Sequence, residues 1–301
     1  MDKTIRLIHN NDIDLQRWDR QIENAGNSRI YALSWYLDIL HPDWHGLVYG
    51  DYSYLMPLVF SRKWGIGYAY QPLFAQQHGI YPSPPPEIAQ RFTTFLKDRF
   101  RFFELSFNSG NTIEDPDLSV TPFCNYLLPL APGYTDLKRR FTTNCIRNIR
   151  RGREQNTVHT FISPDEYLKF KQRFGKKTPS IDAETALKKI LHHAGERNAC
   201  SLYGAYSKQN ELTGAAVFLH HSQRYTYLNS VSSPEGMENR SMFALIDTFI
   251  QTHAGEDSLL DFEGSNIDGI ARFFAGFGAQ PETYPHVRLN RLPWPLTLFK
   301  K

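Results

Sequence analysis

Cysteine is scarce in this sequence, and the few cysteines that occur form no motif. Cys124, Cys145 and Cys200 are odd in number and widely spaced along the 301 residues. None belongs to a Cys-x-x-Cys pair or to a zinc-binding spacing. The sequence therefore predicts reduced thiols rather than a disulfide scaffold, and no metal site.

Long apolar runs and strong net charge are missing as well. No segment approaches the ~20 apolar residues that a membrane-spanning helix needs. The N-terminal sequence MDKTIRLIHNND contains no apolar signal core. We therefore expect a cytoplasmic protein with no stable membrane insertion. The formal net charge of +3 is too small to indicate nucleic-acid binding by itself.

Aromatic residues, in contrast, are abundant. The chain has 21 Phe and 16 Tyr, and aromatics make up 14% of it. A tyrosine ring can pack while its hydroxyl stays available, so many tyrosines favour polar clefts with aromatic walls. The length of 301 residues allows a sizeable core, in two domains or in one large one.

The order of predicted helices and strands repeats in the two halves of the chain. Residues 47–60 resemble residues 201–219, and each segment leads through a loop and an amphipathic helix to a strand with acidic residues. In this correspondence Glu104 of FFELSF takes the place of Asp261 of LLDFEGS. The repetition predicts an α+β fold of two tandem domains related by internal duplication. The alternative is that two unrelated α+β domains share such patterns.

Three segments carry a resemblance to a known family. The order of elements and the segment NIDGIARFFAGFGA resemble the GNAT-like acyltransferase fold, and the helix TTNCIRNIRRGREQ resembles the RxxIRRAxK helix of the Fem family. LDFEGS with GIARFFAGFGA resembles that family's last strand and helix. A tandem pair of such domains is similar to the peptidoglycan-bridge aminoacyltransferases of the Fem family.

The resemblance implies a fold and an activity. Residues 1–132 would form a first GNAT-like domain, and residues 133–301 a second one that includes the basic linking helix. The implied activity is that of an acyltransferase, which moves an acyl or aminoacyl group to an amine, in cell-wall precursor metabolism. The donor would be acyl-CoA or aminoacyl-tRNA, and the acceptor a small-molecule or nucleotide-linked amine; no metal is implied.

Two departures from the family pattern keep other functions open. Phe274 stands where GNAT enzymes commonly have a tyrosine that protonates the departing thiolate. The phosphate-binding loop is reduced to SPEGMENRSM, in which Gly236 is the remaining glycine. The alternatives are a catalytically inactive ligand-binding protein of the same fold and a nucleic-acid-binding module.

The candidate catalytic residues are Asp261 and Glu263. Alternate residues of a strand share one face, so the two acids are predicted to lie together with Phe262 on the other side. One of two neighbouring acids tends to have a raised pKa, which suits a general base for the amine. Gly264 and Ser265 would keep the following turn small. The alternative is a strand-end acid that pairs with an arginine such as Arg272.

The candidate substrate-binding residues lie in both halves. Tyr225, Tyr227 and Asn229 alternate along a predicted strand and would line the cleft beside the acids. The alternative is a tyrosine row packed against a helix. In YAYQPLFAQQHGIYP, Gln71 and Gln76 are predicted to recognise a ligand or to hold a loop.

Two segments are candidates for binding phosphate groups. Gly236, Arg240 and Ser241 precede a helix, whose free N–H groups would bind the anionic part of a cofactor; the alternative is a simple helix cap. In the basic helix, Arg147 and Arg151 share a face that suits a pyrophosphate or the phosphates of tRNA. Its alternative is a solvated face.

Overall fold

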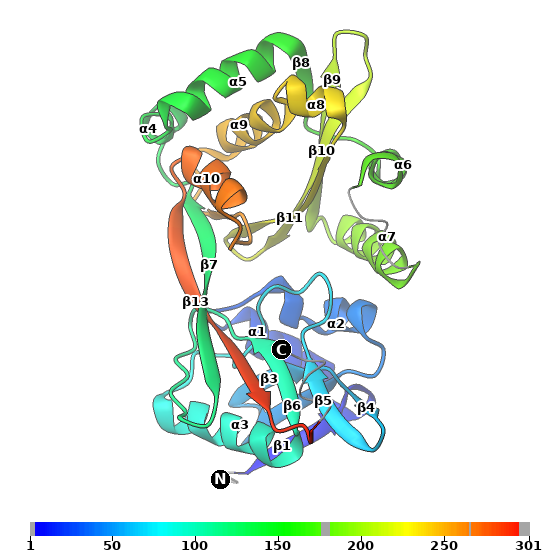
Figure 1. Ribbon diagram of the computed structural model, residues 1–301, viewed down its shortest axis with the longest axis vertical. Helices are drawn as coiled ribbons and strands as arrows, with labels where there is room; N and C mark the ends of the chain where they lie inside the picture. Colours follow the sequence, from blue (N-terminus) through cyan, green and yellow to red (C-terminus); the bar gives the residue numbers. More distant parts are fainter. Residues whose placement is uncertain (1–3, 176–180, 265, 295–301) are drawn as a thin grey trace. The chain divides into compact units, whose positions relative to one another are not determined.

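The computed structural model describes residues 4–175, 181–264 and 266–294 (Figure 1). The chain forms two compact units. The first unit comprises residues 1–123 and 283–301, and the second comprises residues 124–282. Strands β7 and β13 each have residues in both units.

The described residues of the first unit form two groups of strands and three α-helices. Its elements are β1 Ile5–His9, α1 Leu15–Glu23, α2 Ser34–Leu40, β2 His45–Tyr49, β3 Tyr54–Leu58, β4 Phe60–Lys63, β5 Ile66–Tyr70, α3 Pro86–Arg99 and β6 Phe102–Ser106. Strands β1, β2 and β3 are antiparallel. Strand β5 pairs antiparallel with β4 and parallel with β6, and β6 pairs antiparallel with β13 Gln280–Asn290. Phe92 and Leu96 of α3 share a core with Phe103 and Val287 of the adjacent strands.

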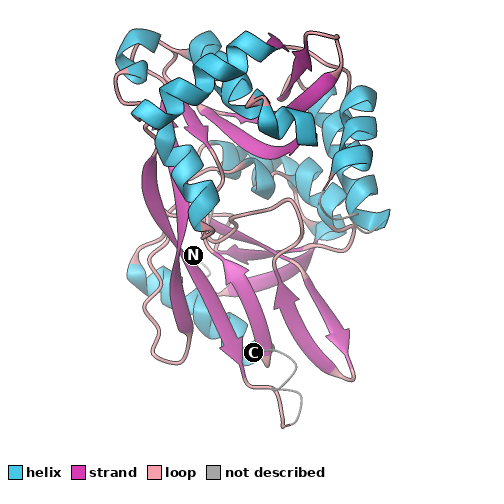
Figure 2. Cartoon of the chain, turned by 45° about the horizontal axis from the view of Figure 1, so that its top comes forward, coloured by secondary structure: helices cyan, strands magenta, loops and turns pink. Residues whose placement is uncertain are grey.

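The second unit is a mixed sheet with helices on both faces (Figure 2). Its elements are β7 Ser119–Pro129, α4 Tyr134–Lys138, α5 Thr143–Gln155, β8 Asn156–His159, α6 Pro164–Phe174, α7 Ile181–Glu196, β9 Cys200–Ser207, β10 Leu212–His221, β11 Arg224–Ser232, α8 Pro234–Glu238, α9 Ser241–His253, β12 Leu259–Asp261 and α10 Asp268–Gly276. The strand order is β7-β12-β11-β10-β9-β8. Helices α5 and α9 lie on one face, and α6 and α7 on the other (Figure 1).

Local sequence signals account for where several helices begin. Asp14 accepts a hydrogen bond from the N–H of Arg17, and Ser163 accepts one from the N–H of Glu166, as expected of N-cap residues. The predicted mixture of helices and strands is confirmed.

In each unit, the described residues include a parallel strand pair that is joined through a helix. Strand β5 leads through α3 to β6, and β11 leads through α9 to β12. Tyr70 is paired with Glu104 at the third step of the first pair, and Thr226 with Asp261 at the third step of the second. The sequence correspondence between Glu104 and Asp261 is thus matched by their positions in the two strand pairs.

Candidate functional site

Strands β11 and β12 separate after a short parallel contact. Residues 224–226 pair with residues 259–261, and β12 ends there. Strand β11 continues to Ser232, so in the described part of the chain its residues 227–232 have no β12 partner. Backbone N–H and C=O groups along such an edge are available to a ligand.

A β-bulge interrupts β11 on this stretch. Val217 pairs with Asn229 and Phe218 with Tyr227, so Leu228 is an extra residue in the ladder to β10. A bulge shifts the alternation of side chains by one position. The prediction that Asn229 continues the face of Tyr225 and Tyr227 is therefore wrong, because it assumed a regular strand.

The two tyrosines pack on the side of α9. The Tyr225 hydroxyl donates to Glu256 at 2.7 Å, and its ring centroid lies 5.3 Å from that of Phe249. Tyr227 is 7% exposed and belongs to the core cluster, and its hydroxyl donates to the sulfur of Met242. The geometry agrees with the alternative interpretation of a tyrosine row packed against a helix.

Asn229 instead binds two side chains of α6. Its Oδ1 accepts hydrogen bonds from the Tyr167 hydroxyl at 2.7 Å and from the Lys171 ammonium at 2.9 Å. Burial raises the pKa of Tyr167 and lowers that of Lys171. Tyr167 and Lys171 were not predicted as site residues. Their i,i+4 spacing on an expected helix was the available signal, but only the bulge brings Asn229 to that face.

Asp261 is buried at the end of β12, and both of its oxygens are bound. Arg224 forms an ion pair with Oδ2, and the backbone N–H of Glu263 donates to Oδ1 at 2.8 Å. The partner arginine is thus Arg224 rather than the suggested Arg272. With both oxygens bound, Asp261 fixes the end of the strand. Its role as a general base stays a prediction.

Glu263 lies beyond the strand. Its φ is +56°, in the left-handed region, so the alternation that would place it beside Asp261 ends before it. Gly264 is tightly packed, because a Cβ there would collide with the carbonyl oxygen of Cys124. Ser265 lies outside the described residues. The role of Glu263 as base or amine anchor stays a prediction.

The predicted phosphate-binding segment has mostly internal contacts. A Cβ at Gly236 would collide with the carbonyl oxygen of Thr213, so this glycine permits close packing of α8 on β10. The Ser241 hydroxyl is buried and lies 2.9 Å from Asn156 Oδ1 and 2.8 Å from Thr213 Oγ1. Arg240 occupies the N-cap position of α9 with φ +61°, and its guanidinium donates to the carbonyl of Met237. Phosphate binding by these residues stays a prediction.

The basic helix α5 has a packed face and an exposed face. Arg153 donates to the fully buried Asp247 of α9 at 2.7 Å. A Cβ at Gly152 would lie 2.6 Å from the carbonyl oxygen of Arg240, so the two helices cross closely there. Arg147 and Arg151 are exposed, and Arg147 donates to Asn144 Oδ1 at 2.8 Å. Binding of a pyrophosphate or of tRNA phosphates by Arg147 and Arg151 stays a prediction.

Gln71 and Gln76 lie in the first unit. Gln71 donates to the carbonyl of Ala75 at 2.9 Å and accepts from the N–H of Ser106 at 3.2 Å, so it holds the loop against β6. Gln76 accepts a hydrogen bond from Gln77. Gln71 also lines a pocket of about 470 Å³.

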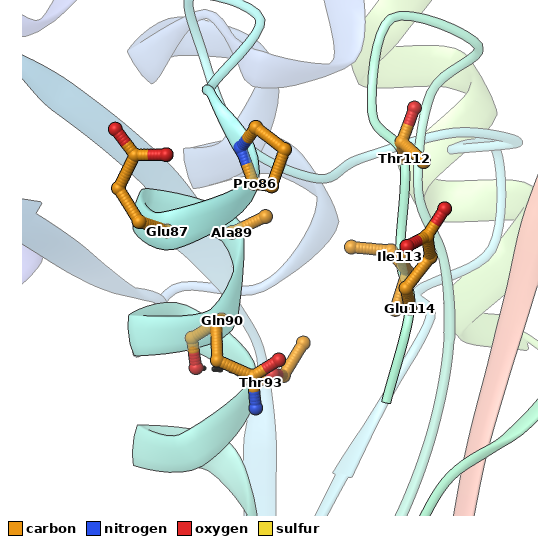
Figure 3. A pocket seen from close by; sticks show the side chains of 8 residues that line it. All are labelled: Pro86, Glu87, Ala89, Gln90, Thr93, Thr112, Ile113 and Glu114. Atoms are coloured by element: carbon orange, nitrogen blue, oxygen red, sulfur yellow. Dashed lines mark hydrogen bonds between the residues drawn. The ribbon is translucent and has the colours of Figure 1, made fainter. Parts of the chain in front are cut away.

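Another pocket, of about 320 Å³, lies at the start of α3 (Figure 3). There Thr93 donates to the carbonyl of Gln90. Among the described residues, no three His, Cys, Asp or Glu side chains gather as metal ligands would. No helix within that part of the chain has the length and apolar character to cross a membrane.

No protein-family model and no curated protein matches the sequence. Solved structures do match. The crystal structure of FemX has a TM-score of 0.65 and 12% identity, over 98% of this chain and 99% of that one. The C-terminal domain of a putative lysylphosphatidylglycerol synthetase from Agrobacterium fabrum has a TM-score of 0.57 and 10% identity, over 93% of each chain. L-PGS from Bacillus licheniformis has a TM-score of 0.54 and 10% identity, over 95% of each chain. The Fem-like fold that the sequence resembles is therefore confirmed over nearly the whole chain.

Proposed function

We propose that this protein is an acyltransferase that moves an acyl or aminoacyl group to an amine. The observation that carries the proposal is the bulged part of β11, which runs on beyond its last pair with β12 and has Asn229 hydrogen-bonded to Lys171. Acyl transfer requires donors that hold the carbonyl oxygen as it becomes negative. An open strand edge with a half-buried ammonium next to it supplies such donors.

The reaction assigns a role to each group. The amine nitrogen attacks the acyl carbon, and the bond from that carbon to the donor's sulfur or oxygen breaks. Those N–H groups of residues 227–232 that point away from β10 would stabilise the oxyanion together with the Lys171 ammonium. Glu263 would take the proton that the amine loses, with Asp261 fixing the strand end through Arg224. Phe274 has no proton to give, so the leaving group would take its proton from solvent or from another side chain.

The anion-binding candidates support two classes of donor. We propose acyl-CoA or aminoacyl-tRNA as the donor. Gly236, Arg240 and Ser241 at the start of α9 are the candidates for the phosphates of the former. Arg147 and Arg151 on the exposed face of α5 are candidates for the latter, because guanidinium groups bind phosphate oxygens in pairs. The names of the similar structures, FemX and lysylphosphatidylglycerol synthetase, support an aminoacyl donor.

The proposal also includes the acceptor, the metabolic role and the origin of the two domains. We propose a small-molecule or nucleotide-linked amine as acceptor, in cytoplasmic cell-wall precursor metabolism. We also propose that residues 1–132 and 133–301 arose by duplication of one GNAT-like domain. The two matched strand pairs, β5–β6 and β11–β12, support this history.

The test is a direct assay of group transfer. The purified chain is incubated with acyl-CoAs or aminoacyl-tRNAs and with amines that include nucleotide-linked muropeptides. The masses of the products are then measured by mass spectrometry. The expected result is an acceptor that gains the mass of the acyl group. Glu263→Gln should then lower turnover by ~10²–10⁴, with an unchanged melting temperature.

A ligand-binding protein without catalysis is the second candidate. Phe274, which is 5% exposed and stacks on Phe262 with ring centroids 4.7 Å apart, favours it, because this buried ring cannot act as an acid. Thermal stabilisation by a donor without any product in the assay would support this candidate. Product formation would exclude it.

A further inference from the structure

The pocket of about 470 Å³ in the first unit combines aromatic walls with one carboxylate. It is lined by Tyr68, Tyr70, Gln71, Phe102, Glu104 and His286. The volume lies within the range of small-molecule sites. Glu104 supplies this carboxylate.

The strand register explains why these side chains gather. Tyr68 and Tyr70 alternate along β5 with Ala69, which is fully buried in the core under α3. Phe102 and Glu104 alternate in the same way along β6. The pocket therefore occupies the sheet face opposite to α3.

Glu104 is held in place but remains accessible. Its Oε1 lies 3.0 Å from Nε2 of His286, and its side chain is 44% exposed. The other ring nitrogen of His286 lies 3.1 Å from the Ser106 hydroxyl. The ring also stacks on Phe123, with centroids 4.2 Å apart and planes 2° apart. When Ser106 donates to Nδ1, Nε2 carries a ring hydrogen and donates it to Glu104.

The aromatic walls are suited to a cation. The ring centroids of Tyr68 and Tyr70 are 5.7 Å apart. The guanidinium of Arg288, which is paired with Glu104 in register, already lies 5.8 Å from the Phe102 centroid. An aromatic face attracts a cation through its quadrupole, and a carboxylate accepts the hydrogen bonds of an ammonium group.

We propose that this pocket binds a primary ammonium group on a short aliphatic chain. The ammonium hydrogen-bonds to the exposed oxygen of Glu104, and the methylene groups lie against Tyr68, Tyr70 and Phe102. This site lies within the first unit and does not depend on the acyltransferase proposed for the second. It would bind its ligand even if the protein transfers no group.

Calorimetric titration of the full chain with 1,5-diaminopentane tests the proposal, and 1,5-pentanediol is the neutral probe of equal length. The diamine should bind and the diol should not. Glu104→Gln should weaken diamine binding by about tenfold to a hundredfold, because it removes the charged acceptor. Tyr70→Leu should weaken binding by about threefold through loss of the aromatic face.

Glu114→Gln is the matched control, since Glu114 is an exposed acid of the same unit outside this pocket. Its affinity for the diamine should equal that of the wild type. Equal binding by Glu104→Gln and the wild type, with unchanged melting temperatures, would overturn the proposal. So would equal binding of the diol, because the pocket would then recognise only the aliphatic chain.

Discussion

The two parallel strand pairs, β5–β6 and β11–β12, have an acidic residue at the same step but in different environments. The Asp261 side chain is 2% exposed and paired with Arg224, whereas that of Glu104 is 44% exposed and bonded to His286. A buried and neutralised acid stabilises the strand end. An exposed acid beside aromatic rings is available to a ligand. The same backbone arrangement therefore supports structure in one unit and recognition in the other.

The largest expected effect concerns the open edge of β11, where Lys171 is the charged group. Lys171→Met should lower turnover by ~10² or more, since it removes a cation from beside the developing oxyanion. Steady-state kinetics with the donor found in the transfer assay would measure it. Lys169→Met on the same helix is the control, because Lys169 is exposed. Equal activity of the two variants would remove Lys171 from the site.

Substitution of the two matched acids would test the comparison directly. Asp261→Asn should lower the free energy of unfolding by about 3 kcal/mol, because Arg224 loses its buried partner. Glu104→Gln should change it by less than about 1 kcal/mol, as expected of a half-exposed pair. Urea denaturation measures both values. A similar loss in the two variants would show that the acids have the same role.

Acidification should destabilise both units, through the buried His78 in the first and the half-buried His220 in the second. Burial lowers the pKa of His78 in the first unit and of His220 in the second from 6.5 to about 4. The unfolded chain binds these protons near pH 6.5 and the folded chain only near pH 4. The free energy of unfolding is therefore highest above pH 6.5. It falls by about 3 kcal/mol per histidine as the pH is lowered to 4.

Denaturation curves between pH 7 and pH 4 measure this loss. In each of His220→Gln and His78→Gln, the loss of unfolding free energy between pH 7 and pH 4 should be smaller by about 3 kcal/mol, the contribution of the histidine that was replaced. This difference does not depend on how stable each variant is at pH 7. Near His220, burial would raise the pKa of Glu256, but hydrogen bonds from Tyr225 and His253 bring it below its ordinary value. Glu256 therefore adds to the loss in acid. An unchanged pH dependence in both variants would contradict the prediction.

The smallest expected effect concerns the exposed face of α5 in the second unit. If the donor is a tRNA, Arg147→Gln and Arg151→Gln should each reduce the slope of log affinity against log salt by about 1. Filter binding at several salt concentrations would measure the slope. Arg150→Gln is the control, since Arg150 lies 3.7 Å from Glu154 of the same helix. An equal reduction in all three variants would indicate a diffuse charge effect.

The sequence predicted the mixture of helices and strands, because that mixture depends on local signals. At Asp14 and Ser163, for example, a side-chain oxygen accepts a hydrogen bond from an N–H three residues later and so begins a helix. The bulge at Leu228 could not be predicted from alternation, so Asn229 was assigned to the wrong face. The partner of Asp261 depends on which strands become neighbours, and Arg224 lies 37 residues away in the sequence.

The first unit is built from two segments of the chain, one before the second unit in the sequence and one after it. Residues 286–290 of β13 pair with residues 102–106 of β6, although all of residues 124–282 separate them in the chain. During synthesis on the ribosome, the second unit is therefore complete before the first has its final strand. Strand β6 presents an unpaired edge in that interval, so a stalled or truncated chain that ends before residue 286 should associate or be degraded even though its second unit is intact.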